Sequence, residues 1–393
     1  FTPEVFWVTK TGNNDIENKL AIRPTSETIA YESYAKWIKS WRDLPLKLNF
    51  WNSVLRAEIK DTKPFIRTSE FLWQEGHTVH ETKDDATKQV EFMLELYKKF
   101  VNEYLALPIL TGKKSDKEKF VGADYTLTLE GIMPDGKALQ MGTSHHLGQN
   151  FSKPFEISFL GKDEEQHFAW QTSWGVSWRL MGALIMTHGD NKGLILPPKI
   201  APIQIVIIPI YYDDVKKNEI LTVIDDIVEK LDSKGIRSYV DSSEQHTPGW
   251  KFNQWEMKGV PIRIEIGPKD LDNNSLVIVK RNSRDKKSIS INENPVDQIV
   301  KELDVIQDEL FEIAKSKHDD MISKSANYKE LCERLNNERG FVKVDWCGDR
   351  DCEDKVKDET GADIRLIEDE NVNSVCIVCE KIATNSVYFA KSY

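Results

Sequence analysis

The sequence predicts a multidomain protein of mixed helices and strands: an α+β block, an α/β block, and a third block that carries the cysteines. Its 393 residues are enough for two or three domains at roughly 150 residues each. The composition, 40% hydrophobic and 10% aromatic, is ordinary for a globular protein. The hydrophobic pattern changes twice along the chain, which predicts boundaries at 198/199 and 293/294.

The first block mixes strand patterns with a helix. Residues 47–55 and 125–132 form strand-like runs, and residues 86–104 have an amphipathic helical pattern. This mixture favours an α+β fold with an antiparallel sheet.

The second block alternates strands and helices. Pro197 and Pro198 favour an extended link before it. The periodicity predicts strands at 203–210, 236–240, 260–266 and 275–280, and helices at 216–234 and 249–258. This order is typical of a small α/β domain. The third block starts with a long helical pattern, and all five cysteines follow it.

Composition and charge exclude several classes of protein. The longest apolar run, 203–210, is much shorter than the ~18 residues of a membrane span. The 64 acidic residues outnumber the 53 basic ones, for a net charge of −11, which argues against a nonspecific DNA-binding protein. An RNA partner bound by a local basic face stays open. Five cysteines, an odd number, do not fit a complete disulfide framework, so we expect a cytoplasmic protein.

Three arginines are candidates for binding an anion. Arg56 ends a predicted strand, Arg67 follows a short polar loop, and Arg179 lies near the start of a helical pattern at 174–186. A guanidinium binds phosphate oxygens in a bidentate manner and keeps its charge. Taken alone, Arg56 and Arg67 also fit surface charges on a hairpin. Arg179 also fits a salt-bridged or snorkelling arginine.

Two adjacent histidines, His145 and His146, lie in a polar segment with two glycines. Because neighbours in a strand point to opposite faces, at most one of them faces a site. A hydrogen-bonded structural histidine is the other interpretation.

Four cysteines form two close pairs, Cys347-x4-Cys352 and Cys376-x2-Cys379. Their number and closeness fit a tetrahedral structural zinc site, although the first spacing is loose. A zinc-dependent hydrolase would need an open metal position, which four cysteines do not leave.

Five motifs are specific in combination. They are Arg-Pro-Thr-Ser-Glu at 23–27, Arg-x-Glu at 56–58, Phe-Leu-Trp-Gln-Glu-Gly-His at 71–77, Thr-Ser-His-His-Leu-Gly-Gln-Asn-Phe at 143–151, and His-Gly-Asp-Asn at 188–191 followed by Leu-Pro-Pro at 196–198. Together they resemble the prolyl-tRNA synthetases, class II (class IIa) enzymes, in their eukaryotic/archaeal type, over nearly the whole chain.

The resemblance implies a class II catalytic domain with an antiparallel sheet at 1–198, an α/β anticodon-binding domain at 199–293 and a C-terminal α/β domain of zinc-binding type at 294–393. It implies an ATP-dependent proline–tRNA ligase that forms prolyl-adenylate, releases pyrophosphate and transfers the prolyl group to the 3′ end of tRNA(Pro). Mg²⁺, structural Zn²⁺ and a homodimer belong to the same expectation. The family's motif 1 has no counterpart before Arg23, so we expect the sequence to be truncated at its start.

The resemblance also assigns roles to residues. The expected catalytic residues are Arg56 and Arg179. The expected ATP-binding residues are Arg56, Glu58, Arg67, Thr68, Phe71, Gln140, Thr143, Ser177 and Arg179, with Mg²⁺ at Gln140. The expected proline-binding residues are Thr25, Glu27, Arg56, Trp73, Glu75, His77, Phe120 and His145. The expected zinc ligands are Cys347, Cys352, Cys376 and Cys379. Tyr393 matches the family's C-terminal tyrosine, whose carboxylate approaches the catalytic domain.

A local basic stretch supports an RNA partner. Residues 251–287 contain nine basic and five acidic residues, a net charge of +4, and local positive charge is typical of RNA binding. Trp250, Phe252 and Trp255 could stack on bases, although the spacing of Trp255 also fits a core aromatic residue. The resemblance implies that the anticodon is read by Lys251, Arg263, Glu265 and Lys269.

Two other functions fit parts of the sequence. A threonyl or histidyl class II synthetase would share the architecture, but the motifs at 71–77 and 143–146 match the proline pocket. A tRNA-binding module without catalysis would commonly lose the phosphate-binding arginines, and all three are present. Arg67 and Arg179 are 112 positions apart, which leaves no room for the editing insertion of bacterial-type relatives, so removal of mischarged alanine is not expected.

Overall fold

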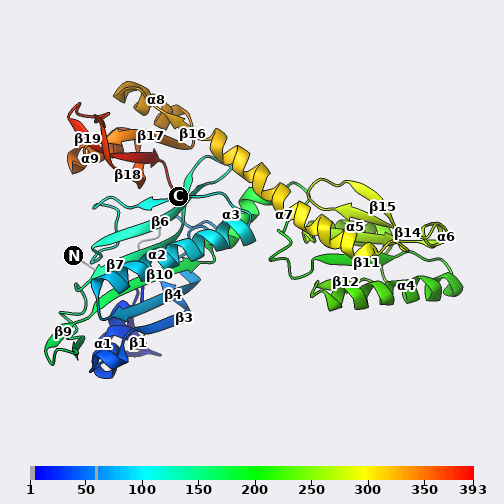
Figure 1. The fold of residues 1–393 in the computed structure, drawn as a ribbon, viewed down its shortest axis with the longest axis horizontal. Helices are drawn as coiled ribbons and strands as arrows, with labels where there is room; N and C mark the ends of the chain where they lie inside the picture. The colour runs from blue at the N-terminus through cyan, green and yellow to red at the C-terminus, as the bar shows by residue number, and fades with distance from the viewer. Residues whose placement is uncertain (1–4, 58–60) are drawn as a thin grey trace. The chain divides into compact units, whose positions relative to one another are not determined.

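A computed structural model describes residues 5–57 and 61–393. Contacts divide the chain into two compact units. The first unit takes in the described residues up to Phe100, then Ile109–Ala183 and His318–Tyr393, and the second takes in Val101–Pro108 and Leu184–Lys317 (Figure 1). None of the helices in the described part of the chain has both the length and the apolar composition of a membrane span.

The first unit is built on a ten-stranded sheet with the order β16-β17-β19-β18-β5-β6-β7-β10-β4-β3. Neighbouring strands are antiparallel except β16 and β17. The strands are β3 (Leu46–Leu55), β4 (Glu70–His80), β5 (Leu110–Lys113), β6 (Tyr125–Ile132), β7 (Ala138–Gly148), β10 (Trp170–Ser177), β16 (Ile322–Lys324), β17 (Phe341–Trp346), β18 (Asp363–Val375) and β19 (Ile382–Ala390). The predicted antiparallel sheet is confirmed.

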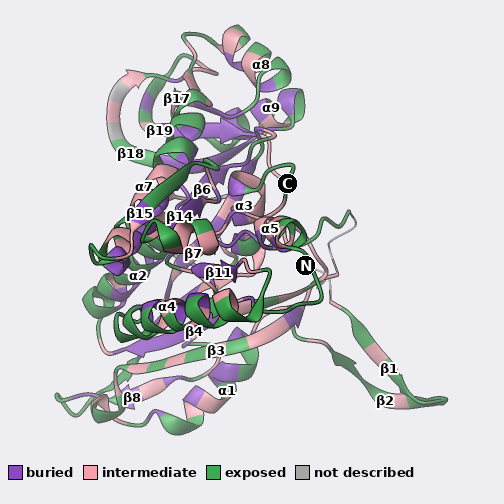
Figure 2. Ribbon diagram, turned by 90° about the vertical axis from the view of Figure 1, so that its right-hand side faces the viewer, coloured by how far each residue is buried: buried purple, intermediate pink, exposed green. Residues whose placement is uncertain are grey.

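Helix α2 (Lys83–Lys99) packs on β4, β6, β7 and β10 of this sheet. The Thr82 side chain caps its first turn by accepting a hydrogen bond from the Asp85 backbone N–H at 3.1 Å. The remaining elements of the unit are the helices α1 (Glu27–Trp37), α8 (Tyr328–Asn337) and α9 (Arg350–Thr360), a 3₁₀ turn at Trp41–Asp43, and the hairpins β1 (Trp7–Thr11)–β2 (Asn14–Ala21) and β8 (Ser158–Leu160)–β9 (Gln166–Phe168). Figure 2 shows the β1–β2 hairpin as largely exposed.

The helical pattern expected at 174–186 begins later than predicted. Strand β10 continues to Ser177, and helix α3 spans Arg179–His188. Trp174 stays in the strand because it pairs with Gly76 of β4 and lies against Tyr97 of α2. A Cβ at Gly76 would overlap the Trp174 ring, so this residue must be glycine for the ring to pack there.

The second unit contains a five-stranded sheet with the order β12-β11-β13-β14-β15. Strand β11 is parallel to β12 and β13, and the other pairs are antiparallel. The strands are β11 (Ile205–Pro209), β12 (Ser238–Val240), β13 (Ile262–Ile266), β14 (Ser275–Lys280) and β15 (Lys286–Ser290), and the helices are α4 (Asp214–Ser233), α5 (Pro248–Met257), α6 (Pro268–Asp272) and α7 (Pro295–Asp320). The predicted α/β alternation is confirmed, and β15 is an additional strand.

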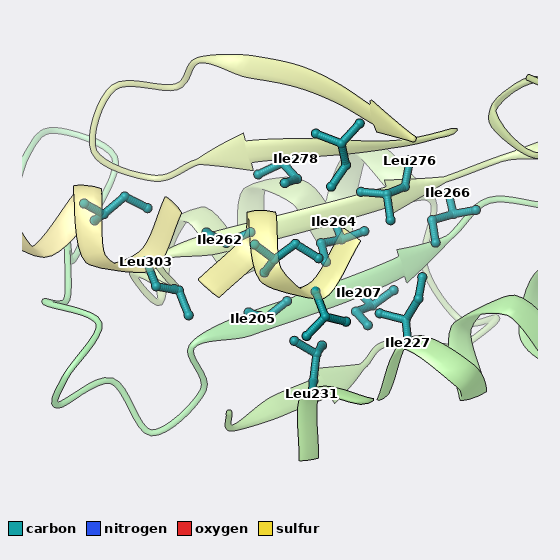
Figure 3. Close-up of a cluster of buried hydrophobic side chains, with 14 of the residues drawn as sticks. Ile205, Ile207, Ile227, Leu231, Ile262, Ile264, Ile266, Leu276, Ile278 and Leu303 are labelled. Atoms are coloured by element: carbon teal, nitrogen blue, oxygen red, sulfur yellow. The ribbon is translucent and has the colours of Figure 1, made fainter. Parts of the chain in front are cut away.

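An isoleucine-rich core holds this unit together (Figure 3). Alternate residues of β13 enter it, which places Arg263 and Glu265 on the other face of the sheet. Leu303 of α7 lies in the same core. Residues 295–317 therefore pack in the second unit, whereas the strands after them join the sheet of the first unit. The predicted domain boundaries at 198/199 and 293/294 stay a prediction.

A fully buried carboxylate, Glu130 on β6, lies inside the long sheet. It accepts a hydrogen bond from Lys114 Nζ at 2.7 Å and another from Arg365 Nε of β18 at 3.1 Å. Burial alone would raise the pKa of Glu130, but the two cations lower it, so the group is ionised at neutral pH. This ion group therefore links the C-terminal strands to the middle of the sheet.

We expect Glu130→Gln to lower the free energy of unfolding by about 3–5 kcal/mol, because it leaves two buried cations without their carboxylate. Urea unfolding of the full chain measures the change. Asp84→Asn, which removes an exposed i,i+4 partner of Lys88, is the control and should cost less than about 0.5 kcal/mol. Equal effects of the two substitutions would contradict the importance of the buried group.

Candidate functional site

A pocket of about 420 Å³ opens on the sheet of the first unit. Along β4, Trp73, Glu75 and His77 line it, whereas Gln74 accepts a hydrogen bond from Tyr97 of α2 at 2.6 Å. Because strand side chains alternate, the pocket lies on the face of the sheet opposite α2.

All the described residues that were predicted to bind ATP or proline line this one pocket. They are Thr25, Glu27, Arg56, Arg67, Thr68, Phe71, Trp73, Glu75, His77, Phe120, Gln140, Thr143, His145, Ser177 and Arg179. Glu58, the remaining predicted residue, lies outside the described residues. Residues that are 154 positions apart in sequence (Thr25 and Arg179) thus reach one site, because β3, β4, β10 and β7 are consecutive neighbours in the sheet.

One end of the pocket is cationic. Arg179 donates hydrogen bonds to the main-chain oxygens of Ile66 and Gln140 at 2.8 and 3.2 Å. Arg56 donates to the main-chain oxygen of Pro24 at 3.2 Å, and its guanidinium lies 5.2 Å from the centre of the Phe71 ring. Among the described residues, neither arginine forms an ion pair with a carboxylate. Burial lowers the pKa of Arg179 to about 10, so it stays positively charged at neutral pH and available to an anion.

The other end of the pocket is acidic. Glu75 is buried, and it accepts hydrogen bonds from His77 Nε2 and Asn52 Nδ2, both at 3.0 Å, and from the Ser26 hydroxyl. Burial raises the pKa of Glu75, but these hydrogen bonds outweigh it and hold the pKa below its usual value. Glu27, also buried, accepts from the Thr25 hydroxyl. Two carboxylates that face one cavity suit a cationic group.

Of the two adjacent histidines, only His145 lines the pocket. Its ring nitrogens are hydrogen-bonded to Thr126 at 2.8 Å and Thr143 at 3.0 Å. Burial lowers the pKa of His145 to about 3, so its imidazole is neutral at pH 7. His146 points away and stacks on Tyr125, as the alternation of strand side chains predicts.

Several residues that line the pocket or hold its side chains were not given a role from the sequence. Ser26 and Asn52 hold Glu75, and Thr126 holds His145. Ser173 lies on the pocket face of β10. Asn52, Thr126 and Ser173 carry no charge and lie in none of the motifs, so only the strand register brings them to the site, whereas Ser26 belongs to the motif at 23–27. Tyr393 also lines the pocket, and its hydroxyl is hydrogen-bonded to Asp135.

The predicted anticodon residues lie in the second unit. Lys251 is buried on α5, where Nζ donates to the Asp241 main-chain oxygen at 2.7 Å. Arg263 donates to Glu265 in two hydrogen bonds, at 2.9 and 2.8 Å. Lys269 lies in α6. Trp255 is a core residue, as its spacing also allowed, whereas Trp250 is exposed and stacks on an imidazole.

The four cysteines of the two close pairs come together. Cys347 Sγ lies 3.7 Å from both Cys352 Sγ and Cys379 Sγ. All four Sγ atoms, including that of Cys376, lie within 4.8 Å of one another. A tetrahedral zinc site with Zn–S bonds of about 2.3 Å has sulfur atoms about 3.8 Å apart, so this cluster fits the metal.

Comparison with known proteins identifies the class first. Residues 6–188 match the family described as tRNA synthetase class II core domain (G, H, P, S and T). Residues 204–302 match an anticodon-binding domain. Together with the antiparallel sheet and the arginine-lined pocket, these matches define a class II aminoacyl-tRNA synthetase.

The remaining matches identify the family. Residues 328–393 match the C-terminal domain of prolyl-tRNA synthetases. The chain is 54% identical to the proline–tRNA ligase of Cenarchaeum symbiosum over all of this chain and 82% of that protein. It is 49% identical to proline–tRNA ligase 2 of Clostridioides difficile over all of this chain and 81% of that protein. The chain belongs to the proline–tRNA ligase family, and the resemblance predicted from its motifs is confirmed.

Solved structures agree with this assignment. Prolyl-tRNA synthetase from Cryptosporidium parvum complexed with L-proline and AMP has a TM-score of 0.93 and 42% sequence identity, covering all of this chain and 82% of that one. The same enzyme complexed with halofuginone and AMPPNP has a TM-score of 0.92 over all of this chain and 83% of that one. The predicted class II fold is therefore confirmed.

Histidine burial at this sheet predicts a pH dependence of stability. Burial lowers the pKa of His80, at the end of β4, from 6.5 to about 4. Between these values the unfolded chain binds more protons than the folded one, so stability falls as the pH drops below 6.5. At pH 5, keeping His80 neutral in the folded protein lowers the free energy of unfolding by about 2 kcal/mol.

The free energy of unfolding of His80→Gln should fall by about 2 kcal/mol less than that of the parent protein when the pH drops from 8 to 5. Urea unfolding at each pH measures both values. Comparing the two chains cancels the other titrating groups. Parallel stability–pH curves would show that His80 is not held neutral in the folded protein.

Proposed function

We propose that the chain is an ATP-dependent proline–tRNA ligase that forms prolyl-adenylate and then transfers the prolyl group to the 3′ end of tRNA(Pro). The observation that carries this proposal is the division of one pocket into a cationic end, with Arg56, Arg67 and Arg179, and an acidic end, with Glu27 and Glu75. An amino acid has a carboxylate and an ammonium group, and ATP adds phosphates. The two ends therefore match the two substrates in charge.

Adenylation needs positioning and charge stabilisation more than acid–base chemistry. A carboxylate oxygen of proline attacks the α-phosphorus of ATP, and pyrophosphate leaves with the bonding electrons. The attacking group is already ionised, so no general base is required, which agrees with the neutral state of His145. Arg56 and Arg179 would stabilise the negative charge on the phosphorus oxygens, since both are held in place by main-chain carbonyls.

The acidic end would bind proline. The secondary ammonium group of proline would pair with Glu27 and Thr25, and Arg56 would hold the proline carboxylate. The apolar ring fits between aromatic side chains. The ring site would be formed by Trp73, Glu75, His77, Phe120 and His145, all of which line the pocket.

The cationic end would bind ATP. Phe71 and Arg179 would hold the adenine, with Glu58 near its amino group. The other expected ATP contacts are Arg67, Thr68, Gln140, Thr143 and Ser177. Mg²⁺ usually binds few protein groups and several phosphate oxygens, and the Gln140 amide, which lines the same pocket as the arginines, fits this pattern. When bound, the ion would neutralise phosphate charge.

The second unit would bind the tRNA anticodon. We propose that the anticodon contacts are Lys251, Arg263, Glu265 and Lys269. We also propose that the chain has three domains, at 1–198, 199–293 and 294–393. Arg263 lies on the face of β13 opposite the isoleucine-rich core, where it donates two hydrogen bonds to Glu265. Lys251 is the weakest candidate, because Asp241 already pairs with its ammonium group at 3.1 Å.

A homodimer and a cytoplasmic location complete the proposal. Strand β3 is an edge strand, and Trp51 on it is 81% exposed. Leu72 of β4 is 56% exposed on the same face, opposite the pocket. Exposed apolar groups beside an edge strand support a protein interface. Five cysteines, four of them clustered for a metal, fit a reducing compartment.

Amino-acid-dependent ATP–pyrophosphate exchange with all twenty amino acids tests the function. Exchange with proline alone is the expected result. Exchange with threonine or histidine instead would assign the pocket to another class II synthetase, and no exchange would favour a tRNA-binding module.

Arg56→Ala should slow proline-dependent exchange by roughly 10²–10³-fold, because a fixed cation at the reacting phosphate is lost. Arg42→Ala is the matched control, since Arg42 is an exposed arginine that stacks on Trp41 outside the pocket. The control should stay within about twofold of the parent. Retained exchange in a folded Arg56→Ala protein would refute the role of this residue.

Gently purified protein should contain about one zinc per chain, held by four thiolates. Cys376→Ser should lose the metal and melt at a lower temperature, because this sulfur is buried in the cluster. Cys332→Ser, outside the cluster, should keep it. Elemental analysis that finds no zinc in the parent protein would overturn the site.

A further inference from the structure

Three residues on neighbouring strands form a row on the pocket face of the sheet. Ser173 of β10 pairs directly with His77 of β4 on one side and with His145 of β7 on the other. All three line the pocket. Cross-strand partners on one face have Cβ atoms about 4.5–5.5 Å apart, so Ser173 lies between His77 and His145 on the pocket face of the sheet.

Hydrogen bonds fix the two imidazoles in place. His77 Nδ1 accepts from the Tyr31 hydroxyl at 3.4 Å, and Nε2 donates to Glu75 at 3.0 Å. His145 is hydrogen-bonded through both nitrogens to threonine hydroxyls. Neither ring can turn aside without losing a buried hydrogen bond, so the side walls of this row are rigid.

Ser173 differs from its neighbours in the row. It is 2% exposed, and its hydroxyl has no hydrogen-bond partner among the described residues. Both ring nitrogens of each neighbouring histidine are already occupied. Nothing in the described chain therefore requires a hydroxyl at this position, whereas a larger side chain here would enter the pocket that Ser173 lines.

The row lies at the end of the pocket away from the arginines. Along β10, Ser177 pairs with Trp73, Gly175 with Glu75, and Ser173 with His77. Arg179 follows Ser177 by two residues. At about 3.3 Å per residue, Ser173 is about 13 Å along the strand from Ser177. Gly175, between them, has no side chain to block the way.

We propose that Ser173 sets the depth of the amino-acid pocket and so selects the ring size of the substrate. This inference rests on the proposed function. With the substrate carboxylate held at Arg56, the far edge of the imino-acid ring points towards Ser173. That edge of proline has no hydrogen-bonding group, so Ser173 acts through its volume and not through its hydroxyl.

The test is pyrophosphate exchange with three imino acids that differ by one methylene: azetidine-2-carboxylate, proline and pipecolate, whose rings have four, five and six atoms. One methylene in an apolar pocket is worth about 10–200-fold in kcat/KM. Ser173→Val should raise the preference for azetidine-2-carboxylate over proline at least about tenfold. Ser173→Gly should raise the preference for pipecolate over proline by a similar factor.

Two control variants separate size from other effects. Ser173→Ala removes only the hydroxyl, so it should change the two preference ratios much less than Ser173→Gly and Ser173→Val do. Thr172→Val alters the next residue of β10, whose hydroxyl pairs with Thr78 on the α2 face, and should leave all three ratios unchanged. Melting temperatures establish that each variant is folded.

Unchanged ratios in both Ser173→Gly and Ser173→Val would overturn the inference, as would a change of the ratios in Ser173→Ala as large as that in Ser173→Val. The Gly variant keeps the test valid if the Val variant does not fold. A parent protein that fails to exchange with proline would instead contradict the proposed function, so the two failures are distinguishable.

Discussion

Arg179 is held by the main-chain oxygens of Ile66 and Gln140, and the pocket depends on keeping this half-buried cation free of an ion pair with any described carboxylate. Burying an unpaired charge costs several kcal/mol. A glutamate beside it would remove that cost, but would also cancel the charge that a phosphate needs. Carbonyl dipoles offset part of the cost and leave the net charge in place. The turn that carries Ile66 and the start of β7 must therefore stay close to α3.

The same constraint explains why the carboxylates are placed elsewhere. Glu75 lies on β4 among Ser26, Asn52 and His77, which satisfy its oxygens. A carboxylate that already accepts three hydrogen bonds has little to gain by pairing with an arginine. The carboxylates and the arginines thus do not pair with one another, although they line the same pocket. Substrates that carry both charges can then bridge the two ends.

Much of this site could be predicted from the sequence, because charged and aromatic motif residues such as Arg56, Glu75 and Arg179 carry the chemistry. Hydrophobic periodicity also predicted β3, β6, β13 and α4 closely. Asn52 and Thr126 could not be predicted, since each acts only through a partner on another strand. The core on which α7 packs could not be predicted for the same reason. Its apolar stripe is equally compatible with any neighbouring core, and only the folded chain shows that Leu303 packs beside Ile205.

The C-terminal strands belong physically to the catalytic unit. Strand β18 joins the sheet beside β5, and its Arg365 holds the buried Glu130. Cys376 and Cys379 lie in the turn between β18 and β19, and Tyr393, three residues past the end of β19, lines the pocket. A metal in that turn would fix one end of the same hairpin whose other end leads to the site. One hairpin therefore runs from the cysteine turn to the residues that lead to Tyr393 in the pocket.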